Sequence, residues 1–365
     1  MNWKAKPLGS CIEVFDSCRR PVTKKDRVLG PYPYYGASGI VDYVDSYIFE
    51  GLHVLVAEDG ENLRSRKLPI AYLADGRFWV NNHAHVLRAN DENDTRFLSY
   101  MIESLDLSGF ITGSTQPKLS QAALLSIPLR LPKLAEQRRI AGVLGVLDDK
   151  IESNCAQQRI GEQLLRAVIE GILGQFSEAD FISFDAYCTQ SKESVRPENI
   201  GNGDKYIALE HMPRGSVFLN SWETAKLAGI ASNKTRFRHG DLLFGKLRPY
   251  FKKVGVAPVS GVCSTDILVI RPRLPEFLPF IAVIASSDAL IDSISASATG
   301  TRMPRASWKE IATWPVPQIP DETLTVLLHP ANQLMAFLET LSLQNLKLAQ
   351  LRDALLPELM SGRMR

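Results

Sequence analysis

The residues with the clearest chemical potential form a segment in which aromatic and basic side chains alternate. Phe244–Lys253 reads FGKLRPYFKK, and the wider stretch Lys234–Lys253 holds seven Lys and Arg residues against one acid, Asp241. Basic side chains contact phosphates, and arginine also reads base edges in a DNA groove. The segment therefore predicts contact with a nucleic acid, and the alternative is a solvated basic face. The candidate contact residues here are Lys234, Arg236, Lys246, Arg248, Tyr250, Lys252 and Lys253.

A second group of candidates lies in the first half of the chain. GPYPYYGASG (Gly30–Gly39) places three tyrosines among Gly and Pro, and a smaller basic cluster follows at Arg64–Lys67. Aromatic residues in a turn-rich loop suit contact with a partner. The alternative is that these tyrosines close a domain core. The candidate contact residues of this half are Tyr32, Tyr34, Tyr35, Ser38, Arg64, Arg66, Lys67, Asn81, Asn82, Gln116 and Lys118.

Motifs for catalysis and for nucleotide binding are missing from the sequence. It contains no GxxxxGK[ST] loop, no strand–GxGxxG–helix unit, no GxSxG and no HExxH. His83 and His85 share one face of an expected strand, but no partner pair completes a metal site, so structural histidines are the better interpretation. We expect no catalytic residue, no cofactor and no metal.

Composition indicates an ordinary globular chain. The formal net charge is +2, 45% of the residues are hydrophobic, and no apolar run of about 20 residues exists to span a membrane. The N-terminal residues lack the apolar core of a signal peptide. The five cysteines are widely spread and form no CxxC pair. We therefore expect free thiols, no membrane association and a cytoplasmic location.

An internal repeat organises the chain. Thr112–Ile140 begins TGSTQPKLSQAALLSIPLRLP, and the passage that starts at Thr299 reads TGTRMPRASWKEIATWPVPQIP. Four residue types recur without a gap, and EQLLRAVIEG (Glu162–Gly171) later matches DALLPELMSG (Asp353–Gly362). Each half thus contains a variable globular segment, a proline-marked strap and a long helix. Gln116 and Lys118 of the first strap, and Arg302 and Arg305 of the second, are candidate phosphate contacts.

Two long helices follow the straps. Heptad-spaced apolar residues predict coiled-coil packing, and neither helix could bury its apolar stripe alone. If a pseudo-twofold axis relates the halves, the helices pack against each other in antiparallel directions. Asn154 and Asn345 then meet at the middle of the seam and fix its register, unless both face solvent. Pro330 predicts that the second helix starts or kinks near that residue. The apolar seams run through Ile140, Leu144, Leu147, Ile151, Leu165, Val168 and Ile172, and through Leu334, Leu338, Leu341, Leu348, Leu355 and Leu359.

The expected fold class is α+β, with twisted and mainly antiparallel sheets. Strands are expected at 54–60, 78–88, 241–247 and 265–273, with helices at 95–107 and 278–293. The expected domains are a first globular domain at 1–133, a first long helix at 134–176, a second globular domain at 177–320 and a second long helix at 321–365.

The sequence resembles a known family at this point. TGSTQPKLSQAALLSIPLRLPKLAEQRRIAGVLGVLDDKIESN is similar to the first shared region of the specificity subunits of Type I restriction-modification systems. The copy from Thr299 resembles the second shared region, although DETLTVLLHPANQL stands where AEQ-R-IA is expected. GRFWVNNHAHVLR and GVCSTDILVIRPR look like matching strands of the two target-recognition domains.

The resemblance implies a non-catalytic subunit that reads DNA. Two target-recognition domains would each read one half of a split, asymmetric site in double-stranded DNA. The two antiparallel helices would set the unread spacer. Two adenine methyltransferase (modification) subunits would dock on this scaffold, with restriction subunits when present. The alternative function is a coiled-coil adaptor with two protein-binding domains and no DNA recognition, and a catalytic role of its own lacks motifs.

Overall fold

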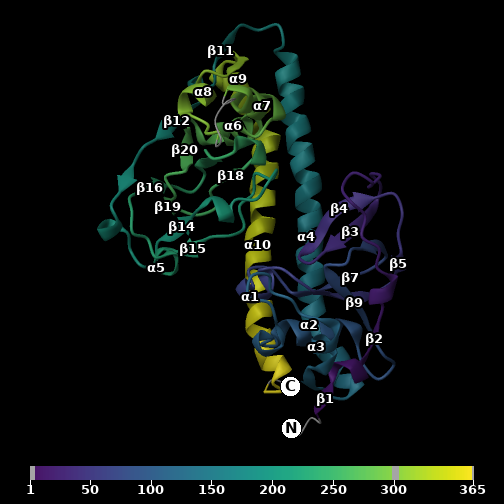
Figure 1. Ribbon diagram of the computed structural model, residues 1–365. Coiled ribbons are helices and arrows are strands. Elements are labelled where there is room, and N and C mark those ends of the chain that lie inside the picture. The colour runs from purple at the N-terminus through teal and green to yellow at the C-terminus, as the bar shows by residue number, and fades with distance from the viewer. Residues whose placement is uncertain (1–4, 298–303, 364–365) are drawn as a thin grey trace. The chain divides into compact units, whose positions relative to one another are not determined.

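The computed structural model describes residues 5–297 and 304–363. The chain divides into two compact units, Met1–Asp149 with Gln350–Arg365, and Lys150–Ala349. Helices α4 (Leu134–Gln175) and α10 (His329–Met360) each contribute residues to both units (Figure 1). Each unit is mixed helix and sheet, as the sequence predicts.

The first unit contains three small sheets and short helices. In chain order its elements before α4 are β1 (Ala5–Pro7), η1 (Leu8–Ser10), β2 (Ile12–Val14), η2 (Asp16–Cys18), β3 (Tyr32–Gly36), β4 (Gly39–Val44), β5 (Phe49–Glu50), β6 (His53–Ala57), α1 (Asn62–Ser65), β7 (Ala71–Ala74), β8 (Arg77–Val80), β9 (Ala84–Ala89), α2 (Thr95–Ser104), η3 (Ser108–Phe110), α3 (Gln121–Ser126) and β10 (Pro128–Arg130).

The second unit follows a similar order. Between α4 and α10 its elements are β11 (Phe181–Ser183), η4 (Phe184–Ala186), β12 (Cys188–Ser191), β13 (Ser194–Val195), η5 (Pro197–Asn199), β14 (Lys205–Ile207), η6 (Leu209–His211), β15 (Glu223–Thr224), α5 (Ala225–Ala228), β16 (Lys234–Phe237), β17 (Leu242–Gly245), η7 (Pro249–Phe251), β18 (Val254–Val256), β19 (Gly261–Cys263), β20 (Ile267–Pro272), η8 (Pro275–Phe277), α6 (Leu278–Ala285), α7 (Asp288–Ser297), α8 (Trp308–Ala312), β21 (Pro315–Pro317) and α9 (Asp321–Leu327).

The sheets of the two units have matching strand orders, except that β13 adds a fifth strand to one sheet of the second unit. The first unit pairs β1 with β10 and orders its larger sheets β2-β9-β6-β7 and β4-β3-β8-β5. The second unit pairs β11 with β21 and orders its larger sheets β12-β20-β17-β18 and β13-β16-β19-β14-β15. Among the described strand pairs only β3–β8 and β14–β19 are parallel. The repeat seen in the sequence is therefore a repeat of topology.

Serine residues in the repeated passage have a local structural role. The side chain of Ser120 accepts a hydrogen bond from the Ala123 amide at the start of α3, and Ser307 caps α8 through the Glu310 amide. The N-cap position favours serine because its hydroxyl satisfies an amide that has no partner inside the helix. The next strand then begins at Pro128 or Pro315 and pairs with the first strand of its unit.

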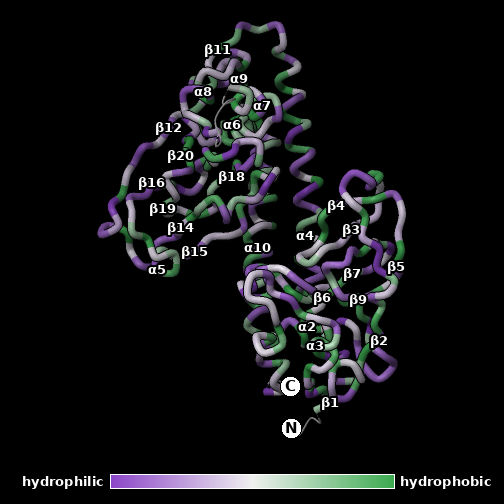
Figure 2. Tube along the Cα trace, in the orientation of Figure 1, coloured by the Kyte–Doolittle hydropathy of each residue, from purple (hydrophilic) through white to green (hydrophobic). Residues whose placement is uncertain are grey.

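Each unit has its own hydrophobic core. In the first unit, β6 and α2 pack with residues of α3 and with the ends of α4 and α10 that belong to this unit. In the second unit, β17, β20 and α6 pack against Leu165, Ile169 and Ile172 of α4. Burying these stripes stabilises the long helices far more than helix propensity does. The alternation of hydrophobic and hydrophilic residues along α4 is visible in Figure 2.

Within each unit, α4 and α10 run in opposite directions. In the second unit, Gln158 donates a hydrogen bond to Ser342, and a Cβ atom at Gly161 would lie 2.4 Å from Leu338 Cδ2. In the first unit, Asp148 of α4 pairs with Arg352 of α10 at 2.8 Å. In these pairs, later residues of α4 meet earlier residues of α10, which defines the antiparallel direction.

The second long helix starts where its proline predicts. Helix α9 ends at Leu327 and α10 begins at His329, so Pro330 lies in the first turn. Proline is tolerated there because the amide it lacks would have no partner in the helix. Across residues 5–297 and 304–363 no single helix is long and apolar enough to cross a membrane, although the bent pair Pro275–Ala285 and Asp288–Ala296 meets the length and composition alone.

Candidate nucleic-acid interface

The strap of the first unit, Thr112–Ser120, is bound to the segment that follows β6. The Leu119 amide donates to the Glu58 carbonyl at 2.8 Å, and the Gly60 amide donates to the Pro117 carbonyl at 3.0 Å. Thr112 and Lys118 exchange backbone hydrogen bonds of 2.8 Å across the strap. These bonds hold Gln116 and Lys118 in an exposed loop of defined shape.

The second unit binds the described part of its strap, residues 304–307, through the same pair of backbone hydrogen bonds. The Ala306 amide donates to the Lys246 carbonyl at 2.9 Å, and the Arg248 amide donates to the Pro304 carbonyl at 3.0 Å. Lys246 therefore corresponds to Glu58, and Arg248 corresponds to Gly60.

Arg248 has the left-handed conformation that glycine usually supplies. Its φ is +49°, and the φ of the corresponding Gly60 is +108°. A non-glycine residue pays about 1–2 kcal/mol for the left-handed region. The segment after β17 therefore keeps an arginine at a position where the backbone favours glycine, and such strained positions cluster at functional sites.

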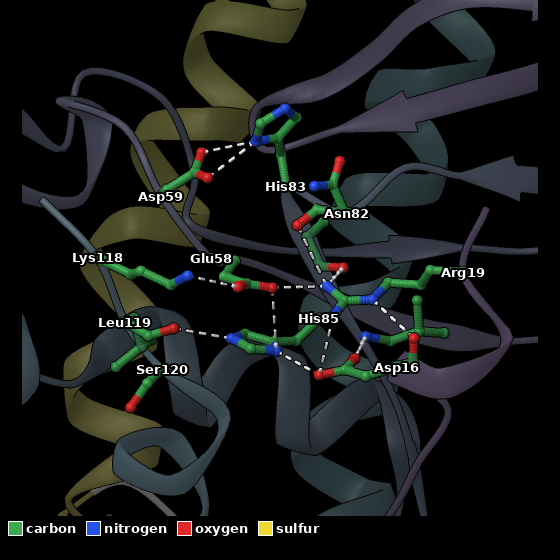
Figure 3. A network of polar contacts seen from close by, with 12 residues as sticks. Asp16, Arg19, Glu58, Asp59, Asn82, His83, His85, Lys118, Leu119 and Ser120 are labelled. Carbon is green, nitrogen blue, oxygen red and sulfur yellow. Dashed lines mark hydrogen bonds and ion pairs between the residues drawn. The ribbon is translucent and has the colours of Figure 1, made fainter. Parts of the chain in front are cut away.

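A buried charge network anchors the first strap (Figure 3). The His85 ring is 1% exposed, with Nδ1 2.6 Å from Asp16 Oδ2 and Nε2 2.8 Å from the Leu119 carbonyl oxygen. A carbonyl oxygen and an ionised carboxylate only accept hydrogen bonds. Both ring nitrogens of His85 therefore face hydrogen-bond acceptors, which hold the ring between Asp16 and the strap. Leu268 stands in its place in the second unit, so this anchor belongs to the first unit alone.

The two carboxylates of the network are stabilised in their ionised form. Burial by itself would raise the pKa of Asp16, but the hydrogen bond and charge of His85, with the charge of Arg19, outweigh it and lower the pKa. Burial would also raise the pKa of Glu58, but the hydrogen bond that Arg19 donates at 2.7 Å outweighs this effect and the pKa is lowered. Lys118 lies 3.3 Å from Glu58. This candidate phosphate contact is thus held in place by an internal acid.

The histidines of NNHAH have structural partners. His83 lies 2.8 Å from Asp59 Oδ2, and His85 is fully engaged by Asp16 and Leu119. Within the described ranges no three His, Cys, Asp or Glu side chains are grouped so that they could hold a metal ion.

The tyrosine segment divides between surface and core. Tyr34 is 1% exposed, and its hydroxyl accepts a hydrogen bond from the Val22 amide at 3.0 Å. The expectation that Tyr34 is an exposed aromatic residue is therefore wrong, because β3 turns this side chain inward. Tyr32 and Tyr35 are half-buried and Ser38 is exposed.

Two of the three basic residues near α1 bond to the backbone of their own unit. Arg64 donates to the carbonyls of Ser114 and Gly113, which ties it to the strap. Arg66 donates to the carbonyls of Leu105 and Glu103. Lys67 is exposed.

The asparagines that follow β8 differ in exposure. Asn81 is 8% exposed, and its side-chain oxygen accepts a hydrogen bond from the His83 amide at 2.8 Å. Asn82 is exposed.

The candidates of the second unit also differ in exposure. Lys234 is 8% exposed, and its ammonium group donates to Ser232, so the expectation that it contacts a ligand at the surface is wrong. Arg248, Tyr250 and Arg305 are exposed, and the remaining candidates are half-buried: Arg236, Lys246, Lys252 and Lys253. Arg302 lies outside the described residues.

The structure adds one basic residue that the sequence patterns missed. The guanidinium carbon of Arg214 lies 4.1 Å from the centre of the Phe251 ring. Arg214 is an isolated arginine in a loop far along the chain from FGKLRPYFKK, so no local pattern marks it. The one signal in the sequence is that Arg214 stands between Pro213 and Gly215, two residue types that favour exposed turns.

The two asparagines of the helix seam are in contact. Asn154 Nδ2 lies 2.8 Å from Asn345 Oδ1, and the two residues are 0% and 8% exposed. The Asn345 amide also donates to the Cys155 sulfur at 3.3 Å, while Asn154 Oδ1 is buried without a partner among the described residues. The pair forms a polar layer within the apolar seam of the second unit.

Comparisons with known proteins agree on one family. A family model described as the Type I restriction modification DNA specificity domain matches residues 1–160. A putative Type I restriction enzyme specificity subunit of Haemophilus influenzae is 37% identical over 148 residues, which are 40% of this chain and 37% of that protein. The EcoDI specificity subunit of Escherichia coli is 22% identical over 386 residues, covering 94% of this chain and 84% of its own length.

A solved structure has the same fold. The S subunit of a Type I restriction-modification system from M. genitalium superposes with a TM-score of 0.62 and 16% sequence identity, covering 98% of this chain and 96% of that one. The family model, the relatives in sequence and this structure point in one direction. Together they indicate a specificity subunit of a Type I restriction-modification system.

Proposed function

We propose that this chain is a non-catalytic DNA-recognition subunit in which each globular unit reads one half of a split, asymmetric site. One observation carries the proposal: both units bind a strap to the segment after a central strand through the same pair of backbone hydrogen bonds. Several of the candidate DNA contacts lie on these straps and segments, among them Gln116, Lys118, Lys246, Arg248 and Arg305. The target-recognition domains would be residues 1–133 and 177–320.

The long helices would act as the spacer between these domains. Helix α4 has 42 residues, which at 1.5 Å per residue gives about 63 Å. Half-sites one duplex turn apart are separated by about 34 Å. Helix α10 has 32 residues, which gives about 48 Å. An antiparallel pair of helices of these lengths, within the spacer segments 134–176 and 321–365, would hold two domains at that distance and still overlap. The antiparallel contacts inside each unit support this arrangement.

The outer faces of the helices suggest where two copies of a partner dock. Asn154 and Asn345 are 191 positions apart, and the same offset relates exposed apolar residues of α4 and α10. Val146 is 68% exposed and Phe337 is 50% exposed, while Ile160 and Leu351 are 66% and 48% exposed. A repeated chain presents the same surface twice. We propose that two modification subunits bind these surfaces and supply the methyl-transfer chemistry in the cytoplasm, with restriction subunits when present.

Methylation mapping tests this function. Cells expressing the chain with its cognate modification subunit should show adenine methylation at one bipartite motif, read by genome-wide methylation sequencing. A modification subunit expressed alone is the control. Methylation without a sequence preference that depends on this chain would contradict the proposal and revive the adaptor alternative, which family membership does not favour.

A further inference from the structure

Most basic side chains of Lys234–Lys253 have partners inside the second unit. Three lysines donate hydrogen bonds within the unit: Lys234 to the carbonyl and hydroxyl of Ser232, Lys246 to the Thr265 carbonyl, and Lys253 to the Leu209 carbonyl. Three further side chains form ion pairs: Arg236 and Arg238 with Glu193, and Lys252 with Asp288. These bonds use donors that would otherwise face a ligand. The basic character of this segment is therefore much less available than its composition indicates.

Arg248 and Arg214 are different, because among the described residues the side chain of each contacts only an aromatic ring. Arg214 lies over the Phe251 ring at 4.1 Å, and the Arg248 guanidinium carbon is 6.0 Å from the same ring centre. Within the described ranges neither has an ion pair with an acid. Both are exposed. Stacking on a ring orients a guanidinium while leaving its N–H edges open to solvent.

The loop that carries the ring is held firmly. Arg248 and Lys252 both have positive φ values, +49° and +50°, and flank the single turn η7. The Gly215 amide, next to Arg214, donates to the Lys252 carbonyl at 3.3 Å, and the Arg248 amide donates to Pro304 of the strap. These backbone bonds thus hold the segments that carry Arg214 and Arg248 close to the loop that carries the ring.

The two guanidinium carbons lie 4.1 and 6.0 Å from one ring centre, and neither group is ion-paired with an acid among the described residues. Like charges repel, and an anion that contacts both groups would relieve that repulsion. Arginine pairs with phosphate in bidentate geometry. We propose that Arg214 and Arg248 together bind one backbone phosphate of the DNA half-site read by the second unit, with Phe251 as the platform that orients them. This inference rests on the proposed function of DNA recognition.

The first unit does not offer the same site. Its corresponding loop runs from Gly60 to Arg66, also begins and ends with positive φ, and has its arginines bonded to backbone carbonyls. The phosphate contact is therefore expected in one half of the bipartite site only.

Binding to duplex DNA as a function of salt tests the assignment. The probe for the full chain is a mixed-sequence duplex, and the complex with its modification subunits is then measured on the motif that methylation sequencing defines. We expect Arg214→Ala to bind several-fold more weakly in both assays. In the Arg214→Ala/Arg248→Ala double variant, the plot of log association constant against log salt concentration should become less steep by about 0.9, the value for one phosphate contact. Phe251→Leu should weaken binding in the same direction.

Arg196→Ala is the matched control, because this exposed arginine lies 3.9 Å from its neighbour Glu198 and faces no ring. It should bind as the wild type does. Wild-type affinity and slope in Arg214→Ala would overturn the inference. So would a slope change near 1.8 in the double variant, which would mean two separate phosphates, or relaxed specificity at one base with an unchanged slope. Failure of the wild-type chain and complex to bind duplex DNA would instead overturn the proposed function, and this inference with it.

Discussion

Replacing the buried asparagine pair by leucine should stabilise the second unit. Asn154 Oδ1 is buried and has no hydrogen-bond partner in the described part of the chain, which costs about 1–3 kcal/mol, while the bond from Asn154 to Asn345 contributes about 0.5–1.5 kcal/mol. We take the gain from burying two leucines to be offset by overpacking, which costs about 1–3 kcal/mol in a tight seam. The Asn154→Leu/Asn345→Leu variant should then be about 1–2 kcal/mol more stable than the wild type.

The single variant should behave in the opposite way. Asn154→Leu removes the donor to Asn345 Oδ1 and leaves that buried oxygen unsatisfied, at a cost of about 1–3 kcal/mol relative to the double variant. Residues in direct contact commonly couple by about 0.5–3 kcal/mol, so the effects of the two single substitutions should not add.

Thermal unfolding followed by tryptophan fluorescence measures both effects. Three of the four described tryptophans, Trp222, Trp308 and Trp314, lie in the second unit and report on it. For a unit of about 200 residues, 1 kcal/mol corresponds to about 2–4 °C, so the double variant should melt about 2–8 °C higher. Gln157→Leu, at an exposed position of α4, is the control and should change stability by less than about 0.5 kcal/mol. A lower melting point in the double variant, or a single variant as stable as the double, would refute the reasoning.

Three further predictions follow from the same structure. Burial raises the pKa of the Cys188 and Cys263 thiols to about 12, whereas Cys18 is exposed. A maleimide should therefore label Cys18 in the folded chain and leave the two buried thiols unlabelled, as measured by mass spectrometry. Equal labelling rates for the three thiols would contradict this prediction. The lowered pKa of Asp16 means that its stabilisation is present above the ordinary aspartate pKa of about 3.9 and is lost as the pH falls through the folded value. The difference in melting temperature between wild type and Asp16→Asn should therefore shrink below about pH 4, and a constant difference would count against the network. Inserting seven residues at the middle of both long helices lengthens each helix by about 10.5 Å. The methylated motif should then keep its half-site sequences, and the unread spacer between them should lengthen by about three base pairs. Altered half-site sequences would contradict the spacer proposal.

Several elements could be predicted because their causes are local. Pro330 lies at the start of α10, as the sequence predicts, since the first turn of a helix tolerates proline. The strands at 54–60, 241–247 and 265–273 follow from runs of apolar residues and appear as β6, β17 and β20. The segment 78–88 instead forms two strands, β8 and β9, because the turn at Asn82 and His83 interrupts it.

The candidate interface could be predicted only in outline. The sequence places basic residues near each strap, but it does not say which of them bond within the chain. Lys234 is buried and Arg64 is tied to the strap through backbone carbonyls, and a count of charges would have treated both as available. Such bonds depend on side chains and carbonyls that are distant along the chain.

The sequence by itself determined the repeat, the two long helices, the asparagine pair at equivalent positions and the family, because each is written in residue types at fixed spacing. Only the tertiary structure decided that the His85 ring lies between Asp16 and Leu119, and that Arg214 meets Phe251. The physical reason is that spacing determines which face of an element a residue occupies, whereas its charge partners are set by the packing of segments that lie far apart in sequence.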